Sequence, residues 1–365
     1  MKIVYDSQAL TMQRFGGVSR YFYEIITNME RMESDADITL PVVCADNYYF
    51  NSYVKCFRNL PRGKYFLNKK ILLMYLQLYG KKVDIFHPTN YDLEYMTGCK
   101  YLRKDAKIII TIHDMIHEKI MTSERETIKN KKEMIEKADG IITVSECTKK
   151  DLLEIYPTVD EKKVTVIYHG NSMVDYGDIK EIGNLPKQYI LFVGNRNGYK
   201  NFMQLLNSFA EITKRFPDLY LLCVGGGVFS KEEKKIIASK KIEEKVLQKS
   251  LSDKDLFWAY KNAKCFVFPS QYEGFGIPIL EAFQAKCPTI LSNCSCFPEV
   301  AGDAALYFDV DKENDLIEKI VELIENENFR QELIHRGNER LKKFSWEKAA
   351  MQTYNFYQYI LNLEK

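Results

Sequence analysis

Short and almost continuous apolar runs alternate with helical patterns along the whole chain. Such runs lie at residues 3–5, 108–112, 140–144, 189–193, 220–224 and 265–268. Runs of this kind are typical of parallel strands buried on both faces, with helices as the connections between them. The rhythm breaks at residues 171–187, which are polar and contain two glycines and a proline. The pattern therefore predicts an α/β protein of two successive βα domains joined by a linker there.

Composition narrows the class of protein. The 365 residues are 46% hydrophobic and 28% charged, which is typical of a globular protein of two domains. The net charge of +2 argues against a polyanion-binding molecule. No apolar run approaches the roughly 18–20 residues that span a bilayer, and the chain enters a strand at Lys2 without a signal peptide. Nine cysteines, an odd count, favour reduced thiols and a cytoplasmic location over a disulfide framework or a metal site.

The most informative stretch is residues 269–281, Pro-Ser-Gln-Tyr-Glu-Gly-Phe-Gly-Ile-Pro-Ile-Leu-Glu. It follows an apolar run and predicts a strand, a tight loop and the start of a helix. Backbone amides at a helix start attract anions, while Glu273 and Glu281 can accept hydrogen bonds from hydroxyls. Together they favour a ligand that is both sugar and phosphate. The alternative is an ordinary turn with one surface glutamate and one on a helix face.

Three further loops follow predicted strands. Gly16-Gly17 stands before a helix predicted at residues 20–29, His113 follows the run at 108–112, and Arg196 and Lys200 follow the run at 189–193. Ligands of open α/β sheets bind beyond the carboxyl ends of strands. The two cations suit a diphosphate. The alternatives are a plain turn, a structural histidine and two solvated surface cations.

Residues 53–82 form a basic and aromatic segment. No acidic residue occurs between Asp46 and Asp84, and the interval is rich in lysine, arginine, tyrosine and phenylalanine. A helix of this composition can lie on an anionic membrane surface. It can equally place its apolar face in the core and its lysines in water. Nucleic-acid binding is disfavoured, because the patch is local.

The combination of motifs resembles a known family over nearly the whole chain. The residues that carry the resemblance are Gly16-Gly17-Val18, His113-Asp114, Val144-Ser145-Glu146, Val193-Gly194…Arg196…Lys200-Asn201, Pro269-Ser270…Glu273-Gly-Phe-Gly-Ile-Pro-Ile-Leu-Glu281-Ala282 and Pro298-Glu-Val-Ala-Gly-Asp-Ala-Ala305. They resemble the retaining glycosyltransferases of family 4 (group 1), which have the GT-B fold. Within that family the chain is most similar to bacterial mannosyltransferases of surface-polysaccharide assembly.

The resemblance implies an architecture. GT-B enzymes have two Rossmann-like domains that face each other across a cleft, with a C-terminal helix that crosses back to the N-terminal domain. Applied to this chain, it implies an acceptor-side domain at residues 1–175, a nucleotide-sugar donor domain at 176–345 and a returning helix at 346–365. One segment departs from the family: Ile-Tyr-His-Gly-Asn ends at Asn171, where a Pro-Asn-Gly turn is common.

The resemblance also implies site roles. Arg196 and Lys200 would hold the donor diphosphate, and the loop at Gly16, Gly17 and Val18 would close over it. Glu281 would bind the ribose hydroxyls, and His113 would contact sugar hydroxyls. The donor sugar would be held by Glu273 and its neighbours Gly274, Phe275, Gly276 and Ile277.

The activity implied is retaining transfer of a hexose, mannose first, from a nucleotide-diphosphate sugar to a saccharide or lipid-linked saccharide in polysaccharide, O-antigen or capsule assembly. GDP-mannose is the favoured donor and a UDP-hexose the second; no metal or other cofactor is expected. The protein would be cytoplasmic, with possible peripheral contact with the inner membrane surface. The alternatives are a non-catalytic nucleotide-binding relative, a phosphorylase and an epimerase.

Overall fold

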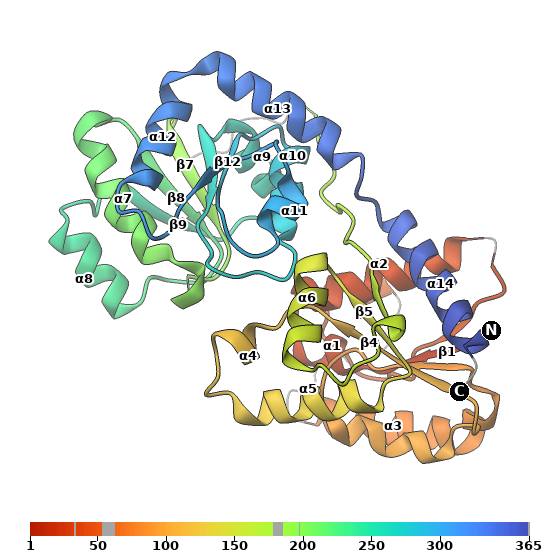
Figure 1. Cartoon of the computed structure of the whole chain (residues 1–365). Coiled ribbons are helices and arrows are strands. Elements are labelled where there is room, and N and C mark those ends of the chain that lie inside the picture. Colours follow the sequence, from red (N-terminus) through yellow and green to blue (C-terminus); the bar gives the residue numbers. More distant parts are fainter. Residues whose placement is uncertain (33, 53–62, 178–184, 197, 364–365) are drawn as a thin grey trace. The chain divides into compact units, whose positions relative to one another are not determined.

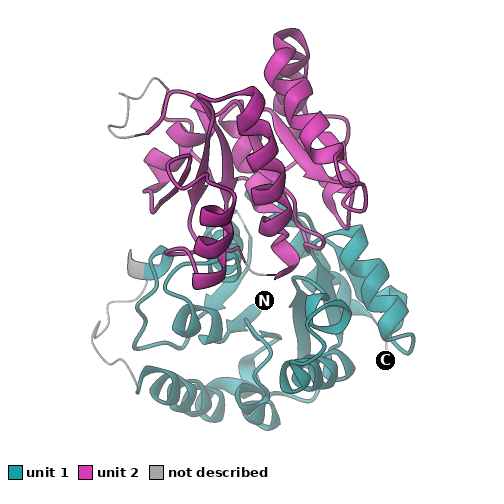
Figure 2. Cartoon of the chain, turned by 90° about the vertical axis from the view of Figure 1, so that its left-hand side faces the viewer, with its two compact units in different colours: residues 1–170, 345–365 teal, residues 171–344 magenta. Residues whose placement is uncertain are grey.

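The chain forms two compact units. A computed structural model describes residues 1–32, 34–52, 63–177, 185–196 and 198–363. Unit 1 comprises residues 1–170 and 345–365, and unit 2 comprises residues 171–344 (Figure 2). The division thus lies after Gly170, at the start of the linker predicted at residues 171–187 and five residues before the boundary that the resemblance implies. Cys56 and the first part of the basic segment lie outside the described residues.

Unit 1 is built on a six-stranded parallel sheet in the order β2-β1-β3-β4-β5-β6. Its strands are β1 Lys2–Tyr5, β2 Asp37–Thr39, β3 Ile85–His87, β4 Lys107–Ile112, β5 Gly140–Thr143 and β6 Val164–Val166. Its α-helices are α1 Gln8–Met12, α2 Gly17–Arg31, α3 Lys64–Tyr79, α4 Ile116–Lys119, α5 Arg125–Lys137, α6 Glu146–Ile155 and α14 Trp346–Asn362. Short 3-10 helices are η1 Tyr49–Ser52, η2 Gly80–Lys82, η3 Leu93–Tyr101 and η4 Glu161–Lys163.

Unit 2 repeats this architecture with the order β12-β11-β10-β7-β8-β9, again all parallel. Its strands are β7 Tyr189–Val193, β8 Tyr220–Val224, β9 Val246–Lys249, β10 Cys265–Phe268, β11 Thr289–Ser292 and β12 Leu306–Phe308. Its helices are η5 Gly198–Lys200, α7 Phe202–Arg215, α8 Lys231–Ser239, α9 Asp253–Asn262, α10 Ile277–Gln284, α11 Phe297–Ala301, α12 Asp315–Glu325 and α13 Glu327–Leu341. The helices labelled in Figure 1 lie on both faces of this sheet. The predicted Rossmann-like fold is therefore confirmed for both units.

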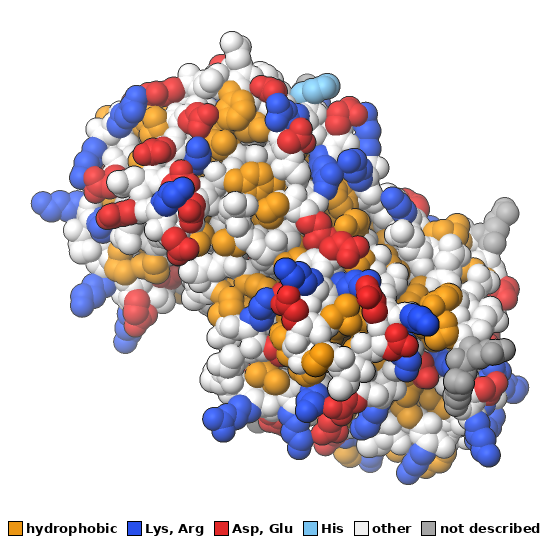
Figure 3. All heavy atoms as spheres, in the orientation of Figure 1, with side chains coloured by type: hydrophobic (Ala, Val, Ile, Leu, Met, Phe, Trp, Pro, Cys, Tyr) orange, Lys and Arg blue, Asp and Glu red, His pale blue; other side chains and the backbone are white. Residues whose placement is uncertain are grey.

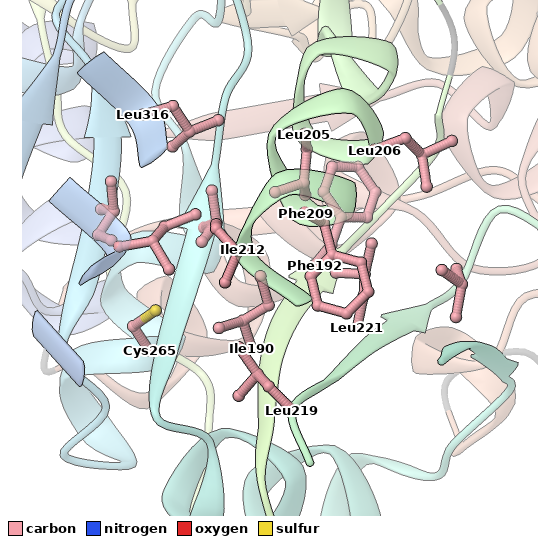
Figure 4. Close-up of a cluster of buried hydrophobic side chains, with 14 of the residues drawn as sticks. Ile190, Phe192, Leu205, Leu206, Phe209, Ile212, Leu219, Leu221, Cys265 and Leu316 are labelled. Atoms are coloured by element: carbon pink, nitrogen blue, oxygen red, sulfur yellow. The ribbon is translucent and has the colours of Figure 1, made fainter. Parts of the chain in front are cut away.

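The core of unit 2 shows how the apolar periodicity produces this packing. Leu205, Phe209 and Ile212 occupy one face of α7 at helical spacing. They pack against alternate strand residues such as Ile190 and Phe192 of β7, all at 0–1% exposure (Figure 4). The cluster fixes β7 at the centre of the sheet, and so places the loop that follows it.

Three elements show how local contacts set their bounds. Strand β2 is short, because only residues 37–39 pair with β1. Residues 297–301 form the short helix α11. Helix α12 ends at Glu325, and the side chain of Asn326 accepts a hydrogen bond from the Phe329 amide at 3.0 Å and so starts a second helix, α13.

The C-terminal helix α14 belongs to unit 1. It packs against α2, and Ser345 caps its first turn by accepting from the Lys348 amide. The Tyr357 hydroxyl lies 2.6 Å from His87 Nδ1 and 2.8 Å from the Tyr5 hydroxyl, and all three side chains are buried. This polar cluster ties the last helix to β1 and β3.

The surface carries both charges. Lysine and arginine are interspersed with aspartate and glutamate on the face shown in Figure 3, as the near-zero net charge leads one to expect. All eight described cysteines are free thiols. None of the described helices has the length and apolar character that crossing a membrane requires. The described residues also contain no group of three or more His, Cys, Asp or Glu arranged to hold a metal ion.

Candidate functional site

The strand order of unit 2 marks a ligand-binding position. The chain starts at β7, adds β8 and β9 on one side, and then adds β10, β11 and β12 on the other. The sheet therefore has its topological switch point between β7 and β10, where loops diverge and open α/β sheets bind ligands. The loop after β7 carries Lys200, and the loop after β10 carries Glu273.

Lys200 and Glu273 meet at this point. Lys200 Nζ lies 2.5 Å from Glu273 Oε1, and their side chains are only 16% and 14% exposed. Burial alone lowers the pKa of Lys200, but the charge of Glu273 and its hydrogen bond outweigh burial, so the pKa is raised above its ordinary value. Lys200 is therefore a charged side chain that is largely buried. The structure brings together two residues that stand 73 positions apart in the sequence.

The loop of Glu273 is held from two sides. The Glu273 amide donates to Ser295 Oγ at 3.2 Å, and Ser295 Oγ donates to the Glu273 carbonyl at 2.5 Å. The Gln271 amide donates to the Tyr199 carbonyl at 2.8 Å, which joins the two loops of the switch point. These bonds fix the backbone on both sides of Glu273.

The loop then turns directly into α10. Gly276 adopts a φ of +89°, in the left-handed region that favours glycine. A Cβ at this position would also lie 3.0 Å from Ile279 Cδ1. Gly274 and Phe275 are buried beside it, with the Phe275 ring packed edge-on against Phe344, and Ile277 begins the helix.

Glu281 is the buried carboxylate of α10. It is 8% exposed and accepts a hydrogen bond from the Tyr260 hydroxyl of α9 at 3.2 Å. Burial, and next the charge of Glu281, raise the pKa of Tyr260 well above its ordinary value, so the hydroxyl keeps its proton and remains a donor. Tyr260 was not singled out from the sequence. The sequence pattern places Tyr260 on the buried face of a helix, but it does not show that Glu281 is its hydrogen-bond partner.

Arg196 follows β7 like Lys200, but its side chain binds the loop after β8 and not Glu273. Its Nε donates to Glu233 Oε1 at 2.6 Å, and its side chain is 4% exposed. The two terminal nitrogens donate to the carbonyls of Gly225, Gly226, Gly227 and Val228 at 2.9–3.3 Å. A Cβ on Gly226 would lie 2.7 Å from the guanidinium, so the close approach requires glycine. In this geometry Arg196 holds the loop after β8, and its role as a phosphate ligand stays a prediction.

Unit 1 has its own switch point between β1 and β3. Asp6 follows β1 and is fully buried. Its carboxylate accepts hydrogen bonds from the amide and hydroxyl of Thr89, which follows β3, and from the amide and side chain of Gln8, at 2.5–3.1 Å. Burial raises the pKa of Asp6 to about 6, although each of these bonds lowers it. Asp6 was not among the predicted site residues, although its position directly after the first strand is one at which ligand-binding residues occur.

A cavity of about 670 Å³ opens at this position. His113, which follows β4, lies on its wall with residues 89–94, Asp114 and His117. The His113 ring packs edge-on against Tyr21, with 5.0 Å between ring centroids, and its Nε2 is buried without a hydrogen-bond partner among the described residues. Burial lowers the pKa of His113 to about 4, despite the nearby charge of Asp114. The imidazole is therefore neutral at pH 7.

A buried lysine supports the backbone beside His113. Lys131 of α5 is 0% exposed, and its Nζ lies 2.9 Å from both Glu118 Oε2 and the Asp114 carbonyl. The pair keeps the turn after β4 in place. A lysine on a charged helix gave no indication in the sequence of this interior role.

The glycine loop lies at the start of α2, as predicted. Gly16 is the N-cap of that helix and Gly17 its first residue. A Cβ on Gly16 would lie 2.5 Å from Gln13 Oε1, which accepts from the Ser19 amide, whereas Gly17 has open space around it. Val18 packs partly against the unit 1 core and also lines the cavity.

Two family models match this chain. Glycosyl transferases group 1 matches residues 178–340, and Glycosyltransferase Family 4 matches residues 15–171. The boundary between the two matches coincides with the boundary between the two units. The chain belongs to the group 1, or family 4, glycosyltransferases.

Individual relatives agree with this assignment. The O-antigen chain mannosyltransferase B of Escherichia coli is 29% identical over 63% of this glycosyltransferase and 63% of its own length. Sucrose-phosphate synthase of Thermosynechococcus elongatus superimposes with a TM-score of 0.77 at 19% identity, covering 98% of each chain. HepE of Anabaena, solved in complex with UDP and glucose, gives a TM-score of 0.76 at 16% identity, covering 98% of this chain and 100% of that one. The structures show the shared GT-B fold.

The sequence match spans less than two thirds of that O-antigen relative. It spans less than a third of the serotype-specific mannosyltransferases WbdA of Escherichia coli.

Proposed function

We propose that the chain transfers a hexose from a nucleotide-diphosphate sugar to a saccharide or lipid-linked saccharide acceptor, with retention at the anomeric carbon. The observation that carries the proposal is the largely buried Lys200–Glu273 ion pair at the switch point of unit 2. A cation and a hydrogen-bond acceptor at one place suit the two chemistries of a sugar nucleotide, an anionic diphosphate and hydroxyl groups. Membership of the glycosyltransferase family supports the same conclusion.

Each donor group has a proposed partner in unit 2. Lys200 binds the diphosphate and neutralises the charge that grows as the sugar leaves. Glu273 accepts hydrogen bonds from the sugar, with the loop at Gly274, Phe275, Gly276 and Ile277 around it. Glu281 accepts from the ribose, and Tyr260 keeps that carboxylate oriented. Arg196 acts on the phosphates only after releasing Glu233 and the loop carbonyls that it now binds.

The proposed reaction breaks the bond from the anomeric carbon to the phosphate oxygen first. Positive charge then spreads over the anomeric carbon and ring oxygen, and the acceptor hydroxyl attacks from the side that the phosphate leaves. The departing phosphate oxygen takes the hydroxyl proton, so no protein nucleophile is needed. In unit 1 the neutral His113 offers Nε2 to a sugar hydroxyl, and the loop at Gly16 and Gly17 binds phosphate.

The proposed donor is GDP-mannose, since the O-antigen relatives are named as mannosyltransferases. A UDP-hexose is the second candidate, since HepE was solved with UDP and glucose. The proposed enzyme uses no metal, because Lys200 supplies the positive charge that a metal would otherwise bring. The proposed transfer would be a step of polysaccharide assembly.

We also propose that α3 contacts an anionic membrane. Phe66, Met74 and Leu78 are 57%, 56% and 73% exposed and repeat at helical spacing. Lys70 stands between them, with Nζ 4.4 Å from the centre of the Phe66 ring. An exposed apolar stripe with lysines and no acidic residue suits the interface of an anionic bilayer.

The test of the proposed function is a transfer assay. The full chain is incubated with GDP-mannose or a UDP-hexose, a mannose-containing oligosaccharide and excess EDTA, and the product is followed by proton NMR. The proposal expects an α-linked product from an α-linked donor, with EDTA without effect. A β-linked product contradicts retention, and release of free hexose without a new linkage contradicts transfer.

A further inference from the structure

The wall of the unit 1 cavity carries carboxylates but no lysine or arginine among the described residues. The carboxylates are those of Asp92, Glu94, Asp114 and Glu126. The Asp92 carboxylate accepts from the Glu94 amide at 2.8 Å and that of Asp114 from the Ile116 amide at 3.0 Å. These bonds hold both side chains without adding a positive charge.

Two lysines that contact residues of this wall are already paired with carboxylates. Lys69 of α3 pairs with Glu94, and Lys131 of α5 is buried against Glu118. His113 of the wall adds no positive charge, because it is neutral at pH 7. Of the four wall carboxylates, only Glu94 has a lysine partner among the described ion pairs. The other three repel anionic groups and can accept hydrogen bonds from hydroxyl groups.

The remaining wall suits a sugar ring. Tyr65, Tyr91, Met12 and Val18 supply apolar and aromatic surface, while Asn90 and Asn130 supply amide groups. His113 Nε2 and His117 Nδ1 are buried and have no hydrogen-bond partner among the described residues. A hydroxyl group that reached either nitrogen would satisfy it, since a hydroxyl can both donate and accept.

We propose that this cavity binds the acceptor as an uncharged saccharide, and that its carboxylates exclude sugars that carry a phosphate or a carboxylate. The proposal rests on the proposed function, because it names the substrate class of that reaction. It also restricts a lipid-linked acceptor: the sugar enters the cavity, and any phosphate of the carrier stays outside it.

The test uses ligand-observed NMR on the full chain with matched sugars. The probes are methyl α-mannoside, mannose 6-phosphate and mannosamine, which are uncharged, anionic and cationic. We expect the mannoside to bind at least about tenfold more tightly than the phosphate, since one opposed charge at short range is worth a factor of this order. Equal binding of the two overturns the proposal, and tighter binding of mannosamine makes the cavity a cation site instead.

Variants locate the effect. Glu126→Gln on α5 should reduce the preference for the uncharged sugar severalfold, while Glu136→Gln, on the same helix and 57% exposed, should leave it unchanged. Thr127→Trp, which adds a bulky ring on the cavity wall, should abolish mannoside binding. A preference that survives Glu126→Gln, or a mannoside that still binds Thr127→Trp, overturns the assignment.

The same samples separate this inference from the proposed function. A thermal shift with GDP or UDP reports on unit 2 without any acceptor. Nucleotide binding without sugar binding overturns the cavity proposal alone. Selective sugar binding without nucleotide binding overturns the proposed function and leaves the cavity proposal standing.

Discussion

Each unit has a switch point in its sheet, and the two switch points differ in the groups that join the facing loops. At the switch point of unit 2, the facing loops are joined by opposite charges, Lys200 and Glu273. At that of unit 1, they are joined by a buried carboxylate, Asp6, which accepts from the uncharged amide and hydroxyl of Thr89 in the facing loop and also from Gln8, which follows it in the chain at the start of α1. An ion pair can exchange its partner for a charged ligand, whereas a closed set of hydrogen bonds can only hold the loops still. The difference supports the two proposals made above, an anionic nucleotide at unit 2 and an uncharged sugar at unit 1.

The largest expected effect comes from removing the cation of unit 2. Lys200→Ala should lower the transfer rate on the order of 10²–10³-fold, as loss of one charge-stabilising group does in other active sites. A matched control is Lys214→Ala on α7, whose side chain is 71% exposed. Single-turnover kinetics with GDP-mannose, alongside melting curves for both variants, make the measurement. A Lys200→Ala enzyme that is folded and turns over normally would reduce Lys200 to a structural partner of Glu273.

Acid should affect unit 1 more than unit 2. Burial lowers the pKa of His87 to about 3 and of His113 to about 4, and holds that of His169 well below its ordinary value. Protonation thus favours the unfolded chain, so the stability that these neutral rings provide is present above about pH 6.5 and is lost as the pH falls toward 4. Between pH 7 and pH 5, His113 alone should cost about 2 kcal/mol.

The two tryptophans, one in each unit, report on this difference. Trp346→Phe leaves Trp258 of α9 as the probe of unit 2, and Trp258→Phe leaves Trp346 of α14 as the probe of unit 1. Urea unfolding at pH 7 and pH 5 should move the Trp346 transition to a lower midpoint by more than the Trp258 transition. Equal shifts would show that the buried histidines do not set the acid response.

Glu281 and Tyr260 separate a binding role from a structural one. Glu281→Gln should weaken nucleoside affinity by about 1–3 kcal/mol, since it removes a charged hydrogen-bond acceptor. Tyr260→Phe removes the hydroxyl that Glu281 accepts from and leaves the carboxylate, so it should weaken that affinity less. Isothermal titration with guanosine and uridine compares them. If both variants bind nucleosides as tightly as the parent, Glu281 does not bind the ribose.

Arg196 gives a smaller effect that sharpens the contrast with Lys200. If Arg196 acts by holding the loop after β8, Glu233→Gln and Arg196→Lys should each weaken GDP or UDP binding by about three- to tenfold, and the double variant should be no weaker than either alone. The preference for the diphosphate over the nucleoside should stay the same. A preference that shrinks in Arg196→Lys alone would make Arg196 a phosphate ligand, as the family resemblance implies.

The smallest effect concerns α3. Lys70→Glu with Leu78→Glu should reduce sedimentation of the protein with vesicles that contain anionic lipid, because it removes one cation and one exposed apolar side chain. Lys132→Glu, a lysine on α5 that is 57% exposed, is the control for net charge. If the parent protein does not sediment with such vesicles, the proposed contact of α3 with a membrane is wrong.

The repeated strands were predictable, because parallel strands that are buried on both faces appear in the sequence as nearly continuous apolar runs. The runs at 108–112 and 189–193 are β4 and β7 in the structure. Lys200 and Glu273 were both named from their loops. Their contact was not predictable, since it depends on β7 and β10 being neighbours although β8 and β9 lie between them in the chain.

The residues that sequence reasoning missed act across elements. Tyr260, Glu233 and Lys131 each gain a role only through a partner on another helix or loop. Arg196 shows the converse: its spacing from Lys200 predicted a shared ligand, but three glycines after β8 bring carbonyls close enough to take up its side chain. Local patterns locate loops, while the direction of a long side chain depends on what the fold places beside it.

The central claim is that unit 2 binds a nucleotide diphosphate through Lys200, without a metal. Its most direct test is a thermal-shift series with GDP, UDP and ADP, each with excess EDTA, on the parent and on Lys200→Ala. A ligand at about 100 times its dissociation constant should add roughly 2.7 kcal/mol of stability. We expect one nucleotide to raise the melting temperature of the parent, and Lys200→Ala to lose most of that shift. No shift with any of the three nucleotides would contradict the claim.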